Sequence, residues 1–173
     1  FTGDLVLPQC APAEVFLDGA IAALRQGTAE KLDGPLGDIF LQSIRDRWSS
    51  ELENASVDEI AEKMSTYDSE QIVGVINVIK GKMFEHLVQI HENNDGDDWY
   101  ASLHGDESYP GSDVVFNNIE TGEVLEVSLK AVSSPRLIEQ ALARYPDIPV
   151  LTTNEMSDVF GSRDGVSFST ILN

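Results

Sequence analysis

The stretch from Ser108 to Val132 constrains the fold most, because it has the pattern of a β-hairpin. An apolar run, Val114 to Phe116, follows Asp113, and Glu120-Thr121-Gly122 offers a turn in which glycine can take a positive φ. The return segment, Glu123 to Val132, alternates apolar and polar residues. This period of two predicts a strand with one face in the core.

The polar face of the return strand has two interpretations. It carries Glu126, Ser128 and Lys130, and Asp113 on the partner strand should lie level with Ser128 to Lys130. The simpler interpretation is a half-buried strand with a solvated polar face. The sharper one is a metal site, because carboxylates from adjacent strands can hold Mg²⁺ and a lysine can orient water or stabilise charge on a phosphoryl group.

The rest of the chain is predicted to be mixed α/β. Apolar spacing predicts helices over residues 12–26, 36–52, 56–64 and 69–93, then a strand over 99–103. After the hairpin we expect a helix over 133–144, a strand over 147–153, a short helix over 154–160 and a strand over 166–172. Pro149 either weakens the prediction of the strand over 147–153 or places that strand at an edge. Residues 1–68 are therefore predicted to be an N-terminal helical extension, and residues 69–173 an α/β domain.

Net charge limits the partners of the chain. Lys and Arg number 11 against 30 Asp and Glu, a formal charge of −19. Such a field repels nucleic acid and anionic membranes at long range and favours metal ions or a basic protein partner. Residues 92–107 carry six acids without Lys or Arg, but Gly96 stands in the wrong register for an EF-hand, so we expect a solvated loop there.

Other features of the sequence concern location and completeness. No apolar run is long enough for a membrane span. Cys10 is the single cysteine, which excludes an internal disulfide and slightly favours a reducing compartment such as the cytoplasm. Phe1 stands where an initiator Met is expected, so we expect the chain to be a piece of a longer protein.

The order of elements from residue 69 onward is helix, strand, strand, strand, helix, strand. With Glu85 in the first helix, Asp113 opening the second strand and Glu126 to Lys130 on the third, this order resembles the PD-(D/E)XK nuclease superfamily over about residues 69–153. The resemblance implies an αβββαβ restriction-endonuclease-like core that binds Mg²⁺ and hydrolyses phosphodiesters. It also implies that Asp113 is a metal ligand, Lys130 the water-orienting or charge-stabilising residue, and Glu85 an outer ligand.

One residue departs from the family pattern. Ser128 stands two residues before Lys130, where the family usually has Asp, Glu or sometimes Gln. Glu126, on the same strand face, could supply the missing carboxylate, and Glu139 on the following helix is a less favoured substitute. The candidate catalytic residues are therefore Asp113, Glu126, Lys130, Glu85 and Ser128, with Asp113, Glu126 and Glu85 as candidate Mg²⁺ ligands.

Two functions follow from these residues. One is metal-dependent phosphodiester hydrolysis by a nuclease-like domain of a larger protein, with DNA or RNA as substrate. The alternative is a non-catalytic protein-interaction module that keeps the nuclease fold. A local basic rim near Asp113, drawn from Lys80, Lys82, Lys130, Arg136 and Arg144, would favour the nuclease, and a continuous acidic surface would favour the module.

Overall fold

A computed structural model describes residues 13–105 and 109–172, so Cys10 and Ser108 lie outside the described part. The described chain falls into two compact units, residues 13–83 and residues 84–172. The division falls within the long helix α5 (Gln71–Asn94). The boundary between residues 68 and 69 that the sequence predicts stays a prediction.

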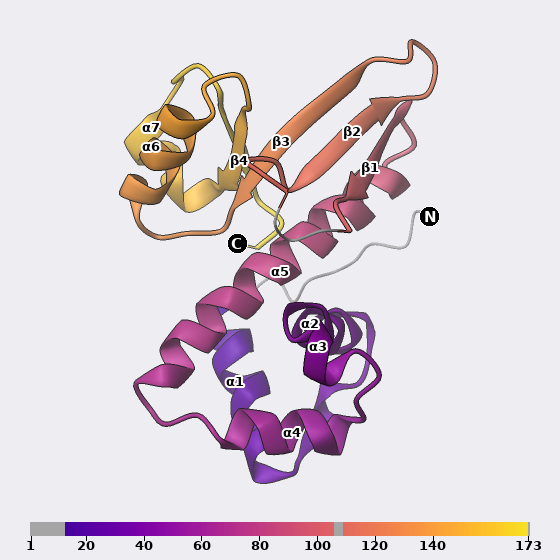
Figure 1. Ribbon diagram of the computed structural model, residues 1–173, viewed down its shortest axis with the longest axis vertical. Helices are drawn as coiled ribbons and strands as arrows, with labels where there is room; N and C mark the ends of the chain where they lie inside the picture. Colours follow the sequence, from indigo (N-terminus) through magenta and orange to yellow (C-terminus); the bar gives the residue numbers. More distant parts are fainter. Residues whose placement is uncertain (1–12, 106–108, 173) are drawn as a thin grey trace. The chain divides into compact units, whose positions relative to one another are not determined.

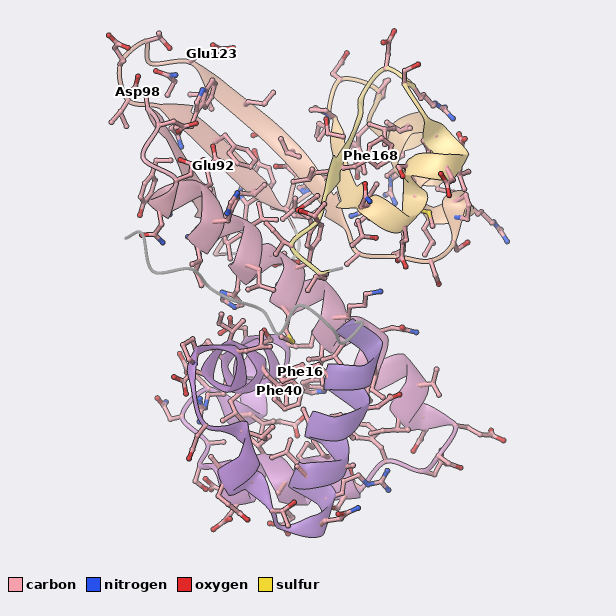
Figure 2. All side chains as sticks on the ribbon, turned by 180° about the vertical axis from the view of Figure 1, so that it is seen from behind. Phe16, Phe40, Glu92, Asp98, Glu123 and Phe168 are labelled. Atoms are coloured by element: carbon pink, nitrogen blue, oxygen red, sulfur yellow. The ribbon has the colours of Figure 1, made fainter. Side chains whose placement is uncertain are left out.

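The first unit is helical. It contains α1 (Ala13–Gln26), a 3₁₀ turn η1 (Ala29–Leu32), α2 (Pro35–Arg47), α3 (Ser49–Leu52), α4 (Val57–Ser65) and the first half of α5. Its core includes fully buried Phe40, and Phe16 meets that ring edge-on with centroids 6.1 Å apart. Figure 2 labels both residues among the helices of this unit. This burial of the apolar stripes holds the helices together.

Two helix boundaries in this unit follow directly from local chemistry. Ser56 and Glu59 form a reciprocal capping box that starts α4, as the sequence predicts. The single helix predicted over 36–52 is wrong, because Trp48 adopts a non-helical backbone (φ −111°, ψ 42°) and separates α2 from α3.

The second unit is a mixed sheet with helices. Its elements are the second half of α5, β1 (Trp99–Leu103), β2 (Val114–Asn118), β3 (Val124–Lys130), α6 (Pro135–Arg144), β4 (Val150–Thr153), η2 (Asn154–Met156), α7 (Ser157–Phe160) and β5 (Val166–Ser169). The five strands lie in the order β1-β2-β3-β4-β5. The pairs β1/β2 and β2/β3 are antiparallel, and β3/β4 and β4/β5 are parallel (Figure 1). The predicted mixed α/β class is confirmed.

The predicted hairpin is confirmed, and its return strand changes partner half-way. Val114 of β2 pairs with Val127 of β3, but from Ser128 onward β3 pairs with β4 on its other edge. Both faces of β3 are covered at this point, since Val127, Ser128 and Leu129 are all buried. The interpretation of a solvated polar face is therefore wrong at Ser128, whose exposed fraction is 3%.

Pro149 does not mark an edge strand. Strand β4 lies between β3 and β5, which contradicts the prediction drawn from this proline. Pro149 precedes the first paired residue of β4, and its carbonyl accepts the Ser128 N–H at 2.9 Å. The missing N–H of proline therefore costs the sheet no bond.

Helix α5 ends beside the edge strand β1. The Asn93 side-chain oxygen accepts the Ala101 N–H at 2.7 Å, and its amide nitrogen donates to the Ala101 carbonyl at 3.0 Å. The Asn93 amide thus occupies the backbone N–H and carbonyl that Ala101 would otherwise offer to another strand.

Candidate active site at the end of β3

Asp113 is the centre of a compact polar cluster. One of its oxygens, Oδ2, accepts hydrogen bonds from Ser128 Oγ at 3.0 Å, the Leu129 backbone N–H at 2.6 Å and Lys130 Nζ at 3.1 Å. The Asp113 and Lys130 side chains are 29% and 28% exposed, so the ion pair is mostly shielded from water. A charge-assisted contact of this kind is stronger than one at the surface.

The cluster exists because β3 changes partner. The Leu129 N–H points toward the β2 edge, where the pairing of β2 stops at Val114. The Asp113 carboxylate replaces the missing strand there, and its own N–H donates to the Val127 carbonyl at 2.9 Å. Asp113 therefore completes the backbone bonding of β3 and presents its charge to Lys130 at the same time.

An open cavity of about 510 Å³ adjoins this cluster. Its walls are formed by the segment before β2, by the end of β3, and by α6 together with Tyr145, which follows α6. The described lining residues are Tyr109, Pro110, Gly111, Asp113, Ser128, Lys130, Leu137, Gln140, Ala141, Arg144 and Tyr145. Among them Lys130 and Arg144 are cationic and Asp113 is anionic, and the carboxylate of Glu126 accepts a hydrogen bond from the lining Tyr109.

Tyr109 is held by contacts on two sides. Its hydroxyl donates to Glu126 Oε1 at 3.1 Å, and its ring stacks on His104 with centroids 4.0 Å apart and planes 13° from parallel. The hydrogen bond to Glu126 raises the pKa of the Tyr109 hydroxyl, because it favours the protonated phenol beside a carboxylate. His104 is held in turn by Ser112, whose buried hydroxyl lies 3.0 Å from His104 Nε2.

Gly111 allows the cavity wall to close around Tyr145. Its φ is +82°, and a Cβ at this position would lie 2.6 Å from the Tyr145 ring. Only glycine meets both conditions without displacing the ring. The Pro-Gly pair before Asp113 is thus explained by backbone geometry and close packing.

The structure brings some of the predicted site residues together and leaves others apart. Asp113, Ser128 and Lys130 meet in one cluster. Glu126 binds the Tyr109 hydroxyl at the edge of the cavity. Glu85 is half-buried on α5 and is not among the lining residues, and Glu139 pairs with Arg163.

Sequence reasoning missed the aromatic and helical part of the lining. Tyr109, Gln140 and Tyr145 were not candidates, although Arg144 was one of the basic residues considered. Lys130 and Arg144 do line the same cavity, whereas Arg136 is not among its lining residues. The proximity of Tyr109 to Pro110-Gly111 was the one available signal, since a turn before a strand often positions functional side chains.

The residues at the cavity fit an open Mg²⁺ site, which water and substrate complete, and do not fit a closed one. Mg²⁺ is commonly held by one or two carboxylates, with water and substrate phosphate completing its shell. Asp113 lines the cavity, and Glu126 accepts a hydrogen bond from the lining Tyr109, so one lining carboxylate and one beside it are available. A closed site of three protein carboxylates does not fit, because among the described residues no group of three potential ligands includes Asp113.

The described residues do contain one such group elsewhere. Carboxylate oxygens of Glu92, Asp95 and Asp97 all lie within 4.8 Å of one another at the end of α5. Burial, with Asp95 and Asp97 nearby, raises the pKa of Glu92. This group could hold a metal ion, but nothing identifies the ion.

Comparisons with known proteins add no assignment. No family model, curated protein or solved structure matches the chain. Within the described residues, no helix combines the length and the apolar character needed to cross a bilayer.

Proposed function

We propose that residues 69–173 form a PD-(D/E)XK-type nuclease domain of a larger protein, which hydrolyses phosphodiesters in the cavity beside Asp113. The observation that carries this proposal is that two cations, Lys130 and Arg144, line one cavity beside Asp113 in a chain of net charge −19. A substrate phosphate is repelled by the chain as a whole, and these two cations offer it a local attraction.

The order of elements supports the proposal. Helix α5, strands β1 to β3, helix α6 and strand β4 follow the αβββαβ order that the family resemblance implies. Asp113 precedes β2 and Lys130 ends β3, as that resemblance requires. A restriction-endonuclease-like core is therefore part of the proposal.

Each polar residue of the cluster has a role in the proposed reaction. Lys130 would stabilise the negative charge that develops on the phosphoryl oxygens, and Arg144 would bind a substrate phosphate. Asp113, with Glu126, would hold Mg²⁺, which when bound supplies Lewis-acid activation of the phosphate. Ser128 and the Leu129 N–H fix the orientation of Asp113 through their hydrogen bonds.

Metal binding and cleavage test the proposal together. Mg²⁺ or Mn²⁺ binding is measured by calorimetry on the wild type and on Asp113→Ala, and cleavage is measured on labelled DNA and RNA. We expect the wild type to bind metal and cleave, and Asp113→Ala to lose both. A wild type that binds no metal and cleaves neither substrate contradicts the proposal.

A matched pair of arginine variants tests the charge argument. Arg144→Gln removes a cation that lines the cavity, whereas Arg163→Gln removes one that pairs with Glu139. Both variants change the net charge equally. We expect the first to weaken substrate binding about tenfold and the second to leave it within about twofold. If both variants weaken substrate binding equally, overall net charge and not the position of Arg144 controls that binding.

A specific observation also favours the non-catalytic alternative. Ser128, at the position of the family's acid, donates to Asp113 and helps tie that carboxylate to β3. Asp113 could therefore serve the fold alone in a module whose acidic surface binds a basic protein. Absence of metal binding and of cleavage in the wild type is the result that this alternative predicts.

A further inference from the structure

We infer that the cavity beside Asp113 takes single-stranded or unpaired nucleic acid, with one base stacked on the Tyr109 ring. This inference rests on the proposed function and adds the class of substrate to it. It is carried by the exposure of Tyr109, by its stack on His104 and by its position in the lining of a cavity that holds two cations.

Among the described residues, His104 is the one aromatic side chain that stacks on the Tyr109 ring. Tyr109 is 45% exposed although His104 covers one face of its ring at a centroid distance of 4.0 Å. Because His104 covers one face, we infer that much of this exposed area belongs to the opposite face and the ring edges. An exposed aromatic ring near cationic side chains, here Lys130 and Arg144, is typical of proteins that bind single strands.

The ring is also held in place before any ligand arrives. The hydroxyl bond to Glu126 and the stack on His104 fix it from two directions, and His104 is itself bound to buried Ser112. A base that stacks on a fixed ring loses less conformational entropy than one that must order a mobile side chain. This favours a role in binding over an accidental exposure.

The other tyrosine of the cavity does not offer an equivalent surface. Tyr145 is half-buried, and Gly111 packs so closely on its ring that a single added carbon would clash. Its ring also lies 5.4 Å from the Arg144 guanidinium carbon. Tyr145 thus shapes the wall and supports Arg144, which leaves Tyr109 as the stacking surface.

The strand state of the substrate follows from the chemistry of stacking. Bases inside a duplex already have both faces covered by their neighbours, so a base reaches Tyr109 only after it has been unpaired and unstacked. A single strand pays no such cost. Every base has a π-face, so this contact selects for unpaired bases without selecting a sequence.

Three labelled ligands separate the contribution of the bases from that of the phosphates. These are a fluorescein-labelled oligothymidylate of about 20 nucleotides, the same strand paired with oligodeoxyadenylate, and a strand of abasic sites of equal length. Binding is measured by fluorescence anisotropy in EDTA, where hydrolysis does not interfere. For the wild type we expect oligothymidylate to bind about tenfold more tightly than the abasic strand and more tightly than the duplex.

Two variants of one residue assign the difference to the ring. Tyr109→Leu keeps an apolar side chain without a π-face, and Tyr109→Phe keeps the ring without its hydroxyl. We expect the leucine variant to bind oligothymidylate and the abasic strand equally, and the phenylalanine variant to retain most of the preference. Circular dichroism and melting temperature confirm that each variant is folded.

The outcomes distinguish this inference from the proposed function. If the wild type binds oligothymidylate and the abasic strand equally, or if Tyr109→Leu keeps the wild-type preference, the stacking inference is wrong while phosphate binding stands. Tighter binding of the duplex than of the single strand would also overturn it. Binding of none of the three ligands would overturn this inference, while the metal-binding and cleavage assays decide the proposed function separately.

Discussion

Two cavities beside the same sheet differ in almost every chemical respect. One has about 350 Å³ and is lined mainly by apolar residues of β1 to β4, including Phe116 and Val150, with Glu92 as its charged member. The other has about 510 Å³ and holds Asp113, Lys130 and Arg144. Strand β3 contributes to both, with Val127 facing the first and Ser128 the second.

The difference shows how one strand can serve two purposes. A period of two sends alternate side chains to opposite faces, so β3 can build an apolar core and a polar site within a few residues. The apolar cavity is stabilised by the burial of apolar side chains away from water. The polar cavity depends on the Asp113 bonds, which exist because β3 exchanges β2 for β4 at Ser128.

The largest effect is expected where the polar cavity loses its central carboxylate. Asp113→Ala leaves the Leu129 N–H and the Lys130 ammonium without their shared acceptor, which should lower the free energy of unfolding by about 3 kcal/mol. Urea denaturation measures this change. Asp113→Asn, which keeps an acceptor oxygen but not the charge, should lose about half as much, and equal losses would show that the ion pair dominates over the backbone bond.

The wall of the polar cavity provides the next test. Gly111→Ala adds a carbon at a φ of +82° and against the Tyr145 ring, so we expect a loss of about 2 kcal/mol in stability. Gly122→Ala is the matched control, because its φ is +74° and its added carbon meets nothing within 4 Å. Thermal unfolding of both variants isolates the Tyr145 contact. Identical losses would mean that backbone conformation alone requires Gly111.

The apolar cavity should respond through stability and not through binding. Val127→Ala removes two methyl groups from a residue that is 6% exposed, which should cost about 1.5 kcal/mol of unfolding free energy. Leu125→Ala, in the same lining but 43% exposed, should cost much less. Nucleic-acid binding by both variants should equal that of the wild type. If either variant changed nucleic-acid binding, the apolar cavity would also contribute to binding, contrary to this prediction.

The smallest effect concerns the one charge of the apolar cavity. Because burial raises the pKa of Glu92 above its ordinary 4.5, ionisation of this carboxyl is less favourable in the folded chain. Its contribution to stability is fully present below pH 4.5 and is lost as pH rises through the raised pKa. Glu92→Gln should therefore raise the melting temperature at pH 7 by about 2 °C and leave it unchanged in acid.

An exposed glutamate serves as the control for this pH dependence. Glu123 is exposed in the hairpin turn, where Figure 2 labels it. Glu123→Gln makes the same change in net charge. If it raises the melting temperature as much as Glu92→Gln does, relief of the overall negative charge, and not burial of Glu92, explains the effect.

The sequence by itself determined the elements that carry the candidate site. Alternation over Glu123 to Val132 predicted β3, a positive-φ glycine predicted its turn, and the level of Asp113 beside Ser128 to Lys130 followed from the hairpin register. These features are local, because side-chain period and turn chemistry act over a few residues.

Only the tertiary structure decided which residues share the cavity. Arg144, Gln140 and Tyr145 come from α6 and its end, and Tyr109 is separated from its partner Glu126 by the whole of β2. The same holds for the burial of Ser128, which no alternation rule could reveal because packing covers both faces of β3. Contacts between segments distant in the chain depend on strand pairing and helix packing, and a single sequence records neither of them directly.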